Sequence, residues 1–417
     1  MIEGIAEKIL PGGESTVRVA GSLMLVANAV PGDQLSVRPT VTRRGVMRAV
    51  IDEVLVAAPA RITPACPVAA ECGGCALQFL DATAHAELKS AWVRDAFSKL
   101  LEKDTQWIEA ETVNIASRRR VRWVIGQDEQ GRFAGFYQHA SHQVVRHDKC
   151  MVLTSALTAL HGILTPYLYE DVEAVQALAL MDGVHVIVET KSADITQLEN
   201  LPALLDGGQL LQWWWRHEGI TRPLKKPIKQ FHDSLPVGDR TIQLSVGPDD
   251  FVQGQQAGNC QLIRQIQQWS GSPRRIADLF CGIGNLSLPL AVATGASLFG
   301  AELNPASVRA ASKNAKQLGV DAHFVQANLF EDFDMVPYIG VDLLILDPPR
   351  RGAKRICSAI HKLMPEKIMM LSCDPAAGAR DGALLRQHGY HLKGLQALDL
   401  FAYAGHVEAL SLWERGA

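Results

Sequence analysis

The sequence lacks the features that would place the protein in a membrane or outside the cell. No uninterrupted apolar run approaches the roughly 18 residues that a membrane-spanning helix needs. The segment from Met1 to Lys8 lacks the basic and then apolar order of a secretory signal peptide. We find no internal repeat and no low-complexity segment. These absences favour a cytoplasmic protein made of ordinary globular domains, with no membrane partner.

The sequence also lacks a strong excess of charge of either sign. It carries 41 basic and 44 acidic residues among 417, which gives a formal net charge of −3. Overall charge therefore reveals no polyanionic partner, and any contact with nucleic acid has to come from local basic clusters. A chain of this length is expected to form two or three domains of roughly 150 residues each.

Residues 1–57 contain short stretches of alternating apolar and polar side chains, such as 16–20 and 34–38, separated by turns with proline and glycine. This pattern predicts a small all-β domain. Five arginines accompany it and would suit an OB-like barrel that contacts a phosphate backbone. Acidic residues are as numerous, so an evenly solvated surface is an equal alternative. The arginines are Arg18, Arg38, Arg43, Arg44 and Arg48.

Three of the eight cysteines form a C-x5-C-x2-C run, with two glycines inside it that allow the backbone to turn tightly. In a cytosolic chain such cysteines are more often reduced, metal-bound or catalytic than disulfide-bonded. Thiolates at this spacing can converge on zinc or on an iron–sulfur cluster, and either would need a fourth ligand. Three unligated buried cysteines are the less favoured alternative. The run is Cys66, Cys72 and Cys75, and the nearest fourth ligand is Cys150.

Residues 84–101 have the periodicity of an amphipathic helix, and residues 117–123 then concentrate four arginines beside Trp123. Arginines that hold phosphates next to a stacking ring are typical of RNA sites. A solvated edge strand explains this segment equally well. The tryptophan run 213–215 could stack on bases, although a hydrophobic core or a domain interface is favoured.

From about residue 251, strands and helices alternate, which predicts a doubly wound sheet. A strand at 275–279 leads into the glycine turn 280–285, and a helix at 286–293 follows. The next strand ends at Glu302, twenty residues after Gly282, where an acid can bind both ribose hydroxyls of an adenosine. The turn reads G-x-G-N and not G-x-G-x-x-G, so S-adenosylmethionine is favoured over a dinucleotide.

Two further buried strands end in polar residues. The segment 341–350 ends in Asp347 and two prolines, which would hold a loop over the cofactor. The run 367–371 is followed by Cys373, at the strand end where open α/β sheets bind ligands. A lone cysteine is more often buried and inert, so its assignment as a nucleophile depends on its neighbours. One candidate for such a neighbour is Glu408, an acid at the start of the last strand.

Taken together, these segments resemble the S-adenosylmethionine-dependent RNA 5-methyluridine methyltransferases over nearly the whole chain. The resemblance implies an α/β protein with a Rossmann-like class I methyltransferase domain at residues 251–417. It also implies a TRAM-like or OB-like β-barrel at residues 1–57. Between them, residues 58–250 would form a central α+β domain that binds RNA and an iron–sulfur cluster.

The resemblance also implies roles for single residues. Cys373 falls on the nucleophile of the S-C-[ND]-P motif, and Glu408 on the terminal H-x-E glutamate that is thought to act as a base. Gln255 departs from the asparagine that the family often has after its F-x-Q motif. The implied ligands of a [4Fe-4S] cluster are Cys66, Cys72, Cys75 and Cys150. The implied S-adenosylmethionine positions are Gln253, Phe280, Asn285, Glu302, Asn328 and Asp347.

The barrel and the cluster resemble the branch that methylates uridine C5 in large-subunit (23S) ribosomal RNA. A transfer-RNA T-loop methyltransferase is the alternative, and a non-catalytic iron–sulfur RNA-binding factor is disfavoured by the presence of both Cys373 and Glu408. Because C6 of a stacked uridine is hidden, we expect a flipped-out base held by arginines of segment 118–122. We expect the protein to act as a monomer.

Overall fold

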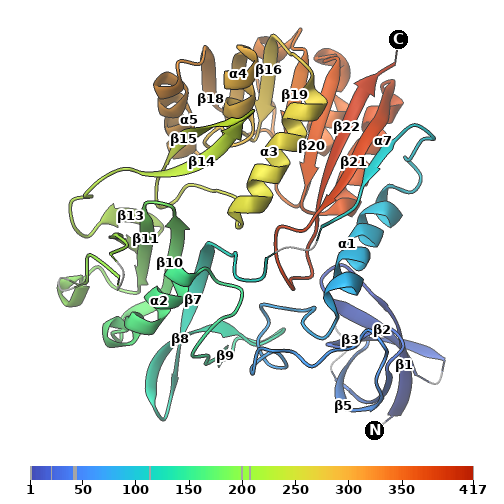
Figure 1. Ribbon diagram of the computed structural model, residues 1–417, viewed down its shortest axis with the longest axis vertical. Coiled ribbons are helices and arrows are strands. Elements are labelled where there is room, and N and C mark those ends of the chain that lie inside the picture. Colours follow the sequence, from blue (N-terminus) through green and yellow to red (C-terminus); the bar gives the residue numbers. More distant parts are fainter. Residues whose placement is uncertain are drawn as a thin grey trace.

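The structure, a computed structural model, describes residues 2–19, 21–40, 45–111, 114–198, 201–205 and 208–416. Arg43 and Arg44, two of the arginines considered above, lie outside the described residues. Figure 1 shows a small barrel and a central sheet beneath a large α/β unit, which contains the C-terminal half of the chain. Among the described residues, no helix has both the length and the apolar character needed to cross a bilayer.

The N-terminal strands close into a barrel in the order β1-β2-β3-β5-β4, which confirms the predicted all-β domain. Apolar side chains on one face of each strand, including Val17, Val26 and Leu35, fill its interior. The three described arginines each pair with an acid of the barrel, which favours the evenly charged surface. The strands are β1 (Ile2–Ile9), β2 (Glu14–Val19), β3 (Ser22–Ala27), β4 (Gln34–Pro39) and β5 (Arg48–Val56).

The central unit is a seven-stranded sheet in the order β13-β12-β11-β10-β7-β8-β9, with α2 (Ser155–Leu164) packed on one face. Trp213 is buried in its core and donates its indole N–H to the Pro202 carbonyl, which confirms the core interpretation for this tryptophan. The strands are β7 (Arg120–Asp128), β8 (Gly131–Tyr137), β9 (Val144–Val145), β10 (Val172–Leu180), β11 (Gly183–Thr190), β12 (Leu211–His217) and β13 (Ile220–Pro223).

The large sheet has the strand order β18-β17-β16-β19-β20-β22-β21-β6, in which β22 alone runs antiparallel to its described neighbours. The predicted doubly wound sheet is therefore confirmed. The strands are β6 (Gln106–Ile108), β16 (Arg275–Leu279), β17 (Ser297–Glu302), β18 (Ala322–Gln326), β19 (Leu343–Leu346), β20 (Lys367–Ser372), β21 (Tyr390–Leu398) and β22 (Glu408–Arg415).

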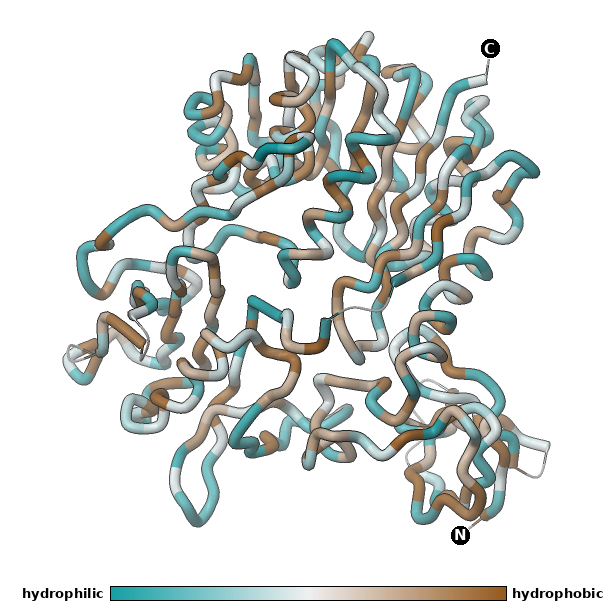
Figure 2. Tube along the Cα trace, in the orientation of Figure 1, coloured by the Kyte–Doolittle hydropathy of each residue, from teal (hydrophilic) through white to brown (hydrophobic). Residues whose placement is uncertain are grey.

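Both faces of this sheet are covered by helices, so its strands read as nearly continuous apolar runs. Met370 packs on the face beneath α1, α6 and α7, whereas Met369 packs on the opposite face beneath α3, α4 and α5. Figure 2 shows hydrophobic residues concentrated along these strands. The helices are α1 (Ala82–Phe97), α3 (Gln256–Ser270), α4 (Ser287–Thr294), α5 (Pro305–Leu318), α6 (Lys354–Ser358) and α7 (Pro375–Gln387).

Two segments that the sequence places in the central domain pack against the large sheet instead. The hairpin of β14 (Phe231–Val237) and β15 (Arg240–Val246) contributes Leu235 and Leu244 to the same apolar cluster as α3 and α4. The short strand β6 pairs with β21 and extends the sheet. A three-residue strand has no detectable periodicity, and its pairing partner lies almost 300 residues away, so local sequence does not reveal it.

Candidate active site

The carboxyl ends of β16, β17, β19 and β20 open onto one cavity of about 520 Å³. Most of the site residues expected from the sequence line this cavity, as the switch-point rule for open α/β sheets predicts. Asn328 is the exception, because it lies beside the cavity and not in its lining. The predicted residues that line it are Gln253, Phe280, Asn285, Glu302, Asp347, Cys373 and Glu408.

One end of the cavity is formed by the glycine turn after β16. Phe280 has a φ of 71°, which is unusual for a residue with a Cβ and marks local strain at the site. The Gly282 amide donates to one carboxylate oxygen of Glu302 at 3.2 Å, and the Asn304 amide donates to the other at 2.9 Å. Glu302, which its spacing from Gly282 singled out, is therefore held against the glycine turn.

Asn285 is fixed by a residue that sequence reasoning missed. Its side-chain amide exchanges two hydrogen bonds with that of Asn259, at 2.8 and 2.9 Å. Asn259 lies on α3 and is fully buried. A buried amide has to satisfy its hydrogen-bonding groups, and here the two amides satisfy each other.

Two residues of the sequence motifs act from outside the cavity lining. The Asn328 side chain accepts a hydrogen bond from the Phe330 amide at 3.2 Å, and the Phe330 ring lines the cavity 5.3 Å from that of Phe280. Asn328 therefore shapes the site through Phe330. Gln255 donates to the Ser117 hydroxyl at 2.6 Å and so joins α3 to the arginine segment.

Asp278, the penultimate residue of β16, was not singled out from the sequence. It lines the cavity, and neither of its carboxylate oxygens has a hydrogen-bond partner among the described residues. Ser287 is close by but outside hydrogen-bond geometry. Burial raises the pKa of Asp278 to about 7. The available signal was an acid between apolar residues in the interior of the strand.

The other end of the cavity brings Cys373 and Glu408 together. Cys373 follows β20 and precedes α7, whose first turn is capped by the Asp374 carboxylate. The antiparallel register of β20 and β22 pairs Ser372 with Ala409. The next residues of the two strands are Cys373 and Glu408, so the register places them opposite each other where both line the cavity.

Burial controls the protonation of this end. It raises the pKa of Glu408 to about 7, against the opposing effect of Arg350. Burial, together with the nearby carboxylates of Glu408 and Asp347, raises the pKa of the Cys373 thiol to about 11. The same causes, burial first and then the charge of Glu408, hold the pKa of Asp347 well above its usual range. The Cys373 thiol therefore has to give up a proton to become nucleophilic, and of the two nearby carboxyl groups only Glu408 has a pKa near neutrality.

The arginines of residues 118–122 mainly make contacts inside the protein and present little charge to solvent. Arg119 is buried and forms a two-pronged ion pair with Asp233, at 2.7 and 2.8 Å. Arg120 donates to the Asp250 carbonyl at 2.9 Å. Only Arg122, among the segment's strand residues, keeps a side chain that is 48% exposed. The expectation that arginines of this segment hold phosphates is therefore wrong for Arg119 and stays a prediction for Arg118 and Arg122, and β7 is an interior strand and not an edge strand.

Three cysteines of one short run and a fourth, more than 70 residues further along, line one cavity of about 50 Å³ in the central unit. Within the described residues, no three His, Cys, Asp or Glu side chains converge tightly enough to hold a single metal ion. An iron–sulfur cluster is larger than one ion and is held by four separate thiolates. The cysteines are Cys66, Cys72, Cys75 and Cys150.

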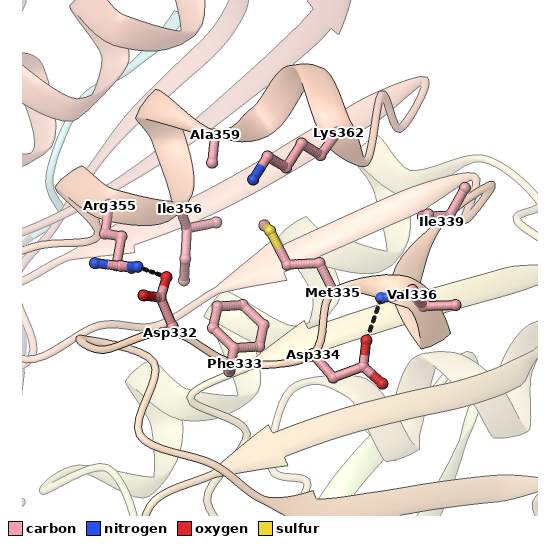
Figure 3. Close-up of a pocket in the computed structure, with 10 residues that line it drawn as sticks. All are labelled: Asp332, Phe333, Asp334, Met335, Val336, Ile339, Arg355, Ile356, Ala359 and Lys362. Atoms are coloured by element: carbon pink, nitrogen blue, oxygen red, sulfur yellow. Dashed lines mark hydrogen bonds and ion pairs between the residues drawn. The ribbon is translucent and has the colours of Figure 1, made fainter.

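A larger surface groove of about 660 Å³ lies elsewhere on the large unit and contains none of the predicted site residues. Figure 3 shows an apolar floor that includes Phe333 and Met335, with Arg355 paired to Asp332 at its edge. Asp334 caps the 3-10 turn that begins at Val336. We find no convergent set of buried polar groups in it, so we assign the chemistry to the cavity at Cys373.

The large sheet has one antiparallel strand, β22, between β20 and β21. Among solved structures, the chain is similar to the tRNA (uracil-54, C5)-methyltransferase of Pyrococcus abyssi in complex with S-adenosyl-L-homocysteine, with a TM-score of 0.76. The similarity covers 99% of this chain and 100% of that one, at 20% identity. It shows that the two proteins share a fold.

Sequence comparison then identifies the family. The family model described as tRNA (Uracil-5-)-methyltransferase matches residues 220–415. The 23S rRNA (uracil(1939)-C(5))-methyltransferase RlmD of Pseudomonas aeruginosa is 31% identical over 98% of this chain and 93% of its own length. That of Shewanella halifaxensis is 30% identical over 94% and 91%. The chain belongs to the RNA uracil-5-methyltransferase family, as its motifs indicated, and is an enzyme.

Proposed function

We propose that the protein transfers a methyl group from S-adenosylmethionine to C5 of a uridine in 23S ribosomal RNA. The observation that carries this proposal is the meeting of Cys373 and a buried Glu408 in the cavity that also contains the glycine turn. The choice of ribosomal RNA rests on the curated relatives, which are named for that reaction and match over more than nine-tenths of both chains.

The residue types fit the chemistry of this substrate. Uracil C5 is a poor nucleophile, but addition of the Cys373 sulfur to C6 converts the ring into an enolate, whose C5 attacks the sulfonium methyl group. A base then removes the C5 proton, and the C6–sulfur bond breaks to restore the ring. The thiol proton is released to solvent as the sulfur attacks, and Asp347, whose raised pKa keeps it protonated, is assigned to orient the reactants and not to transfer protons. We assign the C5 proton to Glu408, because a pKa of about 7 suits a base at neutral pH.

We assign the cofactor to the opposite end of the cavity. Glu302 is placed to bind the ribose hydroxyls, because its carboxylate lies against the glycine turn. Phe280 and Phe330 offer two ring faces for the adenine, and Asn328 holds the second of them in place. The remaining contacts of this end are assigned to Gln253, Asn285 and Asp347.

We further propose that the four cysteines hold a [4Fe-4S] cluster. A Cβ on Gly73 would lie 3.0 Å from the Tyr137 carbonyl, a close contact that favours glycine at this position of the loop. His147 lines the same cavity, is buried between the rings of Phe136 and His161, and has no partner for either ring nitrogen among the described residues. A cluster would offer sulfur acceptors to that ring, and it would cross-link the loop to the central sheet.

The cluster assignment is tested by Cys72→Ser. We expect loss of iron and of the visible absorbance of the cluster, together with weaker RNA binding, because methyl transfer itself moves no net electrons. Purified variant protein with unchanged iron content would contradict the ligand assignment. Unchanged RNA affinity in soluble, iron-free protein would contradict the structural role.

The reaction is tested with labelled S-adenosylmethionine and separate unmodified transcripts of 23S ribosomal RNA and transfer RNA. We expect label at C5 of one uridine in the ribosomal transcript. Label confined to the transfer-RNA T loop would favour the alternative, for which the matching family model and the similar solved structure are named. Cofactor binding with no transfer to either RNA would favour a non-catalytic RNA-binding factor.

A further inference from the structure

The loop of residues 399–407 joins β21 to β22 and delivers Glu408 to the cavity. Its Phe401 side chain lines the same cavity. Tyr403 has a φ of 57°, so the loop includes a strained position that its surroundings have to hold. The contacts that hold this loop in place therefore also position Glu408, the base of the proposed reaction.

Three segments near the N-terminus hold the loop. The Gly12 amide of the barrel donates to the Gly405 carbonyl at 2.8 Å. The Leu77 amide, two residues after Cys75, donates to the Tyr403 carbonyl at 2.9 Å. Both bonds come from the backbone, so a side-chain substitution does not remove them.

The third contact comes from the side chain of Lys89 on α1. Its ammonium donates to the Asp399 carboxylate at 2.7 Å and to the Phe401 carbonyl at 2.9 Å. The same carboxylate oxygen accepts the Phe401 amide at 2.9 Å, so both backbone groups of Phe401 are engaged. The Lys89 side chain is 0% exposed and that of Asp399 is 2% exposed.

A buried ion pair of this kind is poor evidence for stability alone. Removing two charges from water costs about as much as their attraction returns, and well-packed apolar residues would often serve as well. The pair instead fixes the geometry of the loop, because the Lys89 ammonium donates to the Asp399 carboxylate and to the Phe401 carbonyl in a single arrangement. The Arg118 guanidinium lies 5.6 Å from the centre of the Phe401 ring and restrains its other side.

We propose that Lys89 is a positioning residue for methyl transfer, which holds the loop of residues 399–407 so that Phe401 and Glu408 face the target base. The inference rests on the proposed function. Lys89 acts through Asp399 and the Phe401 carbonyl, and it touches no reacting atom. Cys373 lies outside this loop, at the end of β20. Loss of Lys89 should therefore impair removal of the C5 proton more than attack on C6.

Lys89→Met tests this on the full-length protein with a 23S transcript. We expect kcat to fall about a hundredfold, the scale of a displacement of about 1 Å at a catalytic group. We expect the Kd for S-adenosylmethionine to stay within about twofold, because the cofactor end contacts neither Lys89 nor the loop through its described hydrogen bonds. Because elimination becomes slow, a denaturant-resistant protein–RNA adduct should accumulate.

Two further variants separate positioning from stability. Lys89→Met/Asp399→Leu removes both buried charges, so the unfolding temperature should recover relative to Lys89→Met, while kcat stays low and the adduct persists. Activity that returns together with stability would overturn the proposal. Lys393→Met is the matched control, because Lys393 pairs with Asp104 at the surface, and we expect wild-type turnover from it.

Hydrogen exchange tests the loop without RNA. Amides of residues 400–407 should exchange faster in Lys89→Met than in wild type and Lys393→Met, while those of the glycine turn remain unchanged. Equal exchange in all three proteins would overturn the role of Lys89, whatever the enzyme methylates. Failure of the wild type to methylate either RNA would count against the proposed function, and the exchange result would still decide the role of Lys89.

Discussion

The two ends of the cavity are built in different ways. At the cofactor end, the hydrogen bonds around the glycine turn join residues within about thirty positions of one another, as between Gly282 and Glu302 and between Asn285 and Asn259, while Arg119 reaches the Gln253 carbonyl from 134 positions away. At the reactive end, the loop before Glu408 is held by residues more than 300 positions away, including Lys89. The glycine turn is thus held within its own unit, whereas the reactive end depends on the N-terminal units. Substitutions at the first end should change cofactor affinity, and substitutions at the second should change turnover.

The largest effect is expected from Cys373→Ala. Without the thiol no addition to C6 can occur, so kcat should fall by about 10⁴-fold or more. The Kd for S-adenosylmethionine should remain nearly unchanged, as measured by calorimetry. Cys260→Ala on α3 is a suitable control, since this thiol lies outside the cavity lining and should leave turnover intact. Turnover of Cys373→Ala close to that of the wild type would exclude the covalent route.

Glu408→Gln should slow turnover by about 10²- to 10⁴-fold, the usual contribution of a general base. Attack by Cys373 does not require this carboxylate, so the variant should accumulate a covalent RNA adduct that survives denaturing electrophoresis. A variant that turns over freely would show that another group takes the C5 proton. This would weaken the assignment of the reactive end but leave that of the cofactor end untouched.

Glu302→Gln tests the cofactor end of the cavity. Loss of charge-assisted hydrogen bonds to a ribose costs about 1.5–3 kcal/mol, which corresponds to a rise of about 10- to 100-fold in the Kd for S-adenosylmethionine. At saturating cofactor, kcat should change little. Glu331→Gln, a nearby acid outside the cavity lining, provides the control. A large loss of kcat with normal cofactor affinity would erase the proposed difference between the two ends.

The smallest effect is a pH dependence of the wild type. The acceptor form of Glu408 is the carboxylate, and its pKa is about 7, so the active fraction falls as the pH drops below that value. Single-turnover rates at saturating RNA and cofactor should decrease about tenfold from pH 8 to pH 6. Cofactor affinity should not follow the same curve. A flat rate profile across this range would contradict the assignment of Glu408 as the base.

Much of the methyltransferase unit could be predicted because its signals are local. The strand expected at 275–279 is β16 with the same bounds, and the helix expected at 286–293 is α4, shifted by one residue. The helix expected at 84–101 is shorter at its end, because α1 stops at Phe97. Glu302 was found from its spacing to Gly282, and the structure places the two in contact. In each case the prediction came from the apolar periodicity or the turn residues of one short segment.

Other features could not be read in this way. Arg119 belongs to a basic run that resembles a phosphate site, yet it is buried against Asp233, which is 114 positions further along the chain. Asn259 is an unremarkable residue of a helix until Asn285 meets it. Neither residue has a local signal, because its role is defined by its partner.

The sequence by itself determined the resemblance to RNA uracil-5-methyltransferases, because its glycine turn, its strand-end acids and its strand-end cysteine match that family's motifs, and comparison with relatives then confirmed the family. It also placed four cysteines where a cluster could be held. Only the tertiary structure decided how the reactive end is held, because β20 and β22 bring Cys373 and Glu408 together and Lys89 reaches the loop from another part of the chain. The physical reason is that apolar periodicity and turn residues are properties of short segments. A buried ion pair such as Lys89–Asp399 forms only when folding brings two distant residues together.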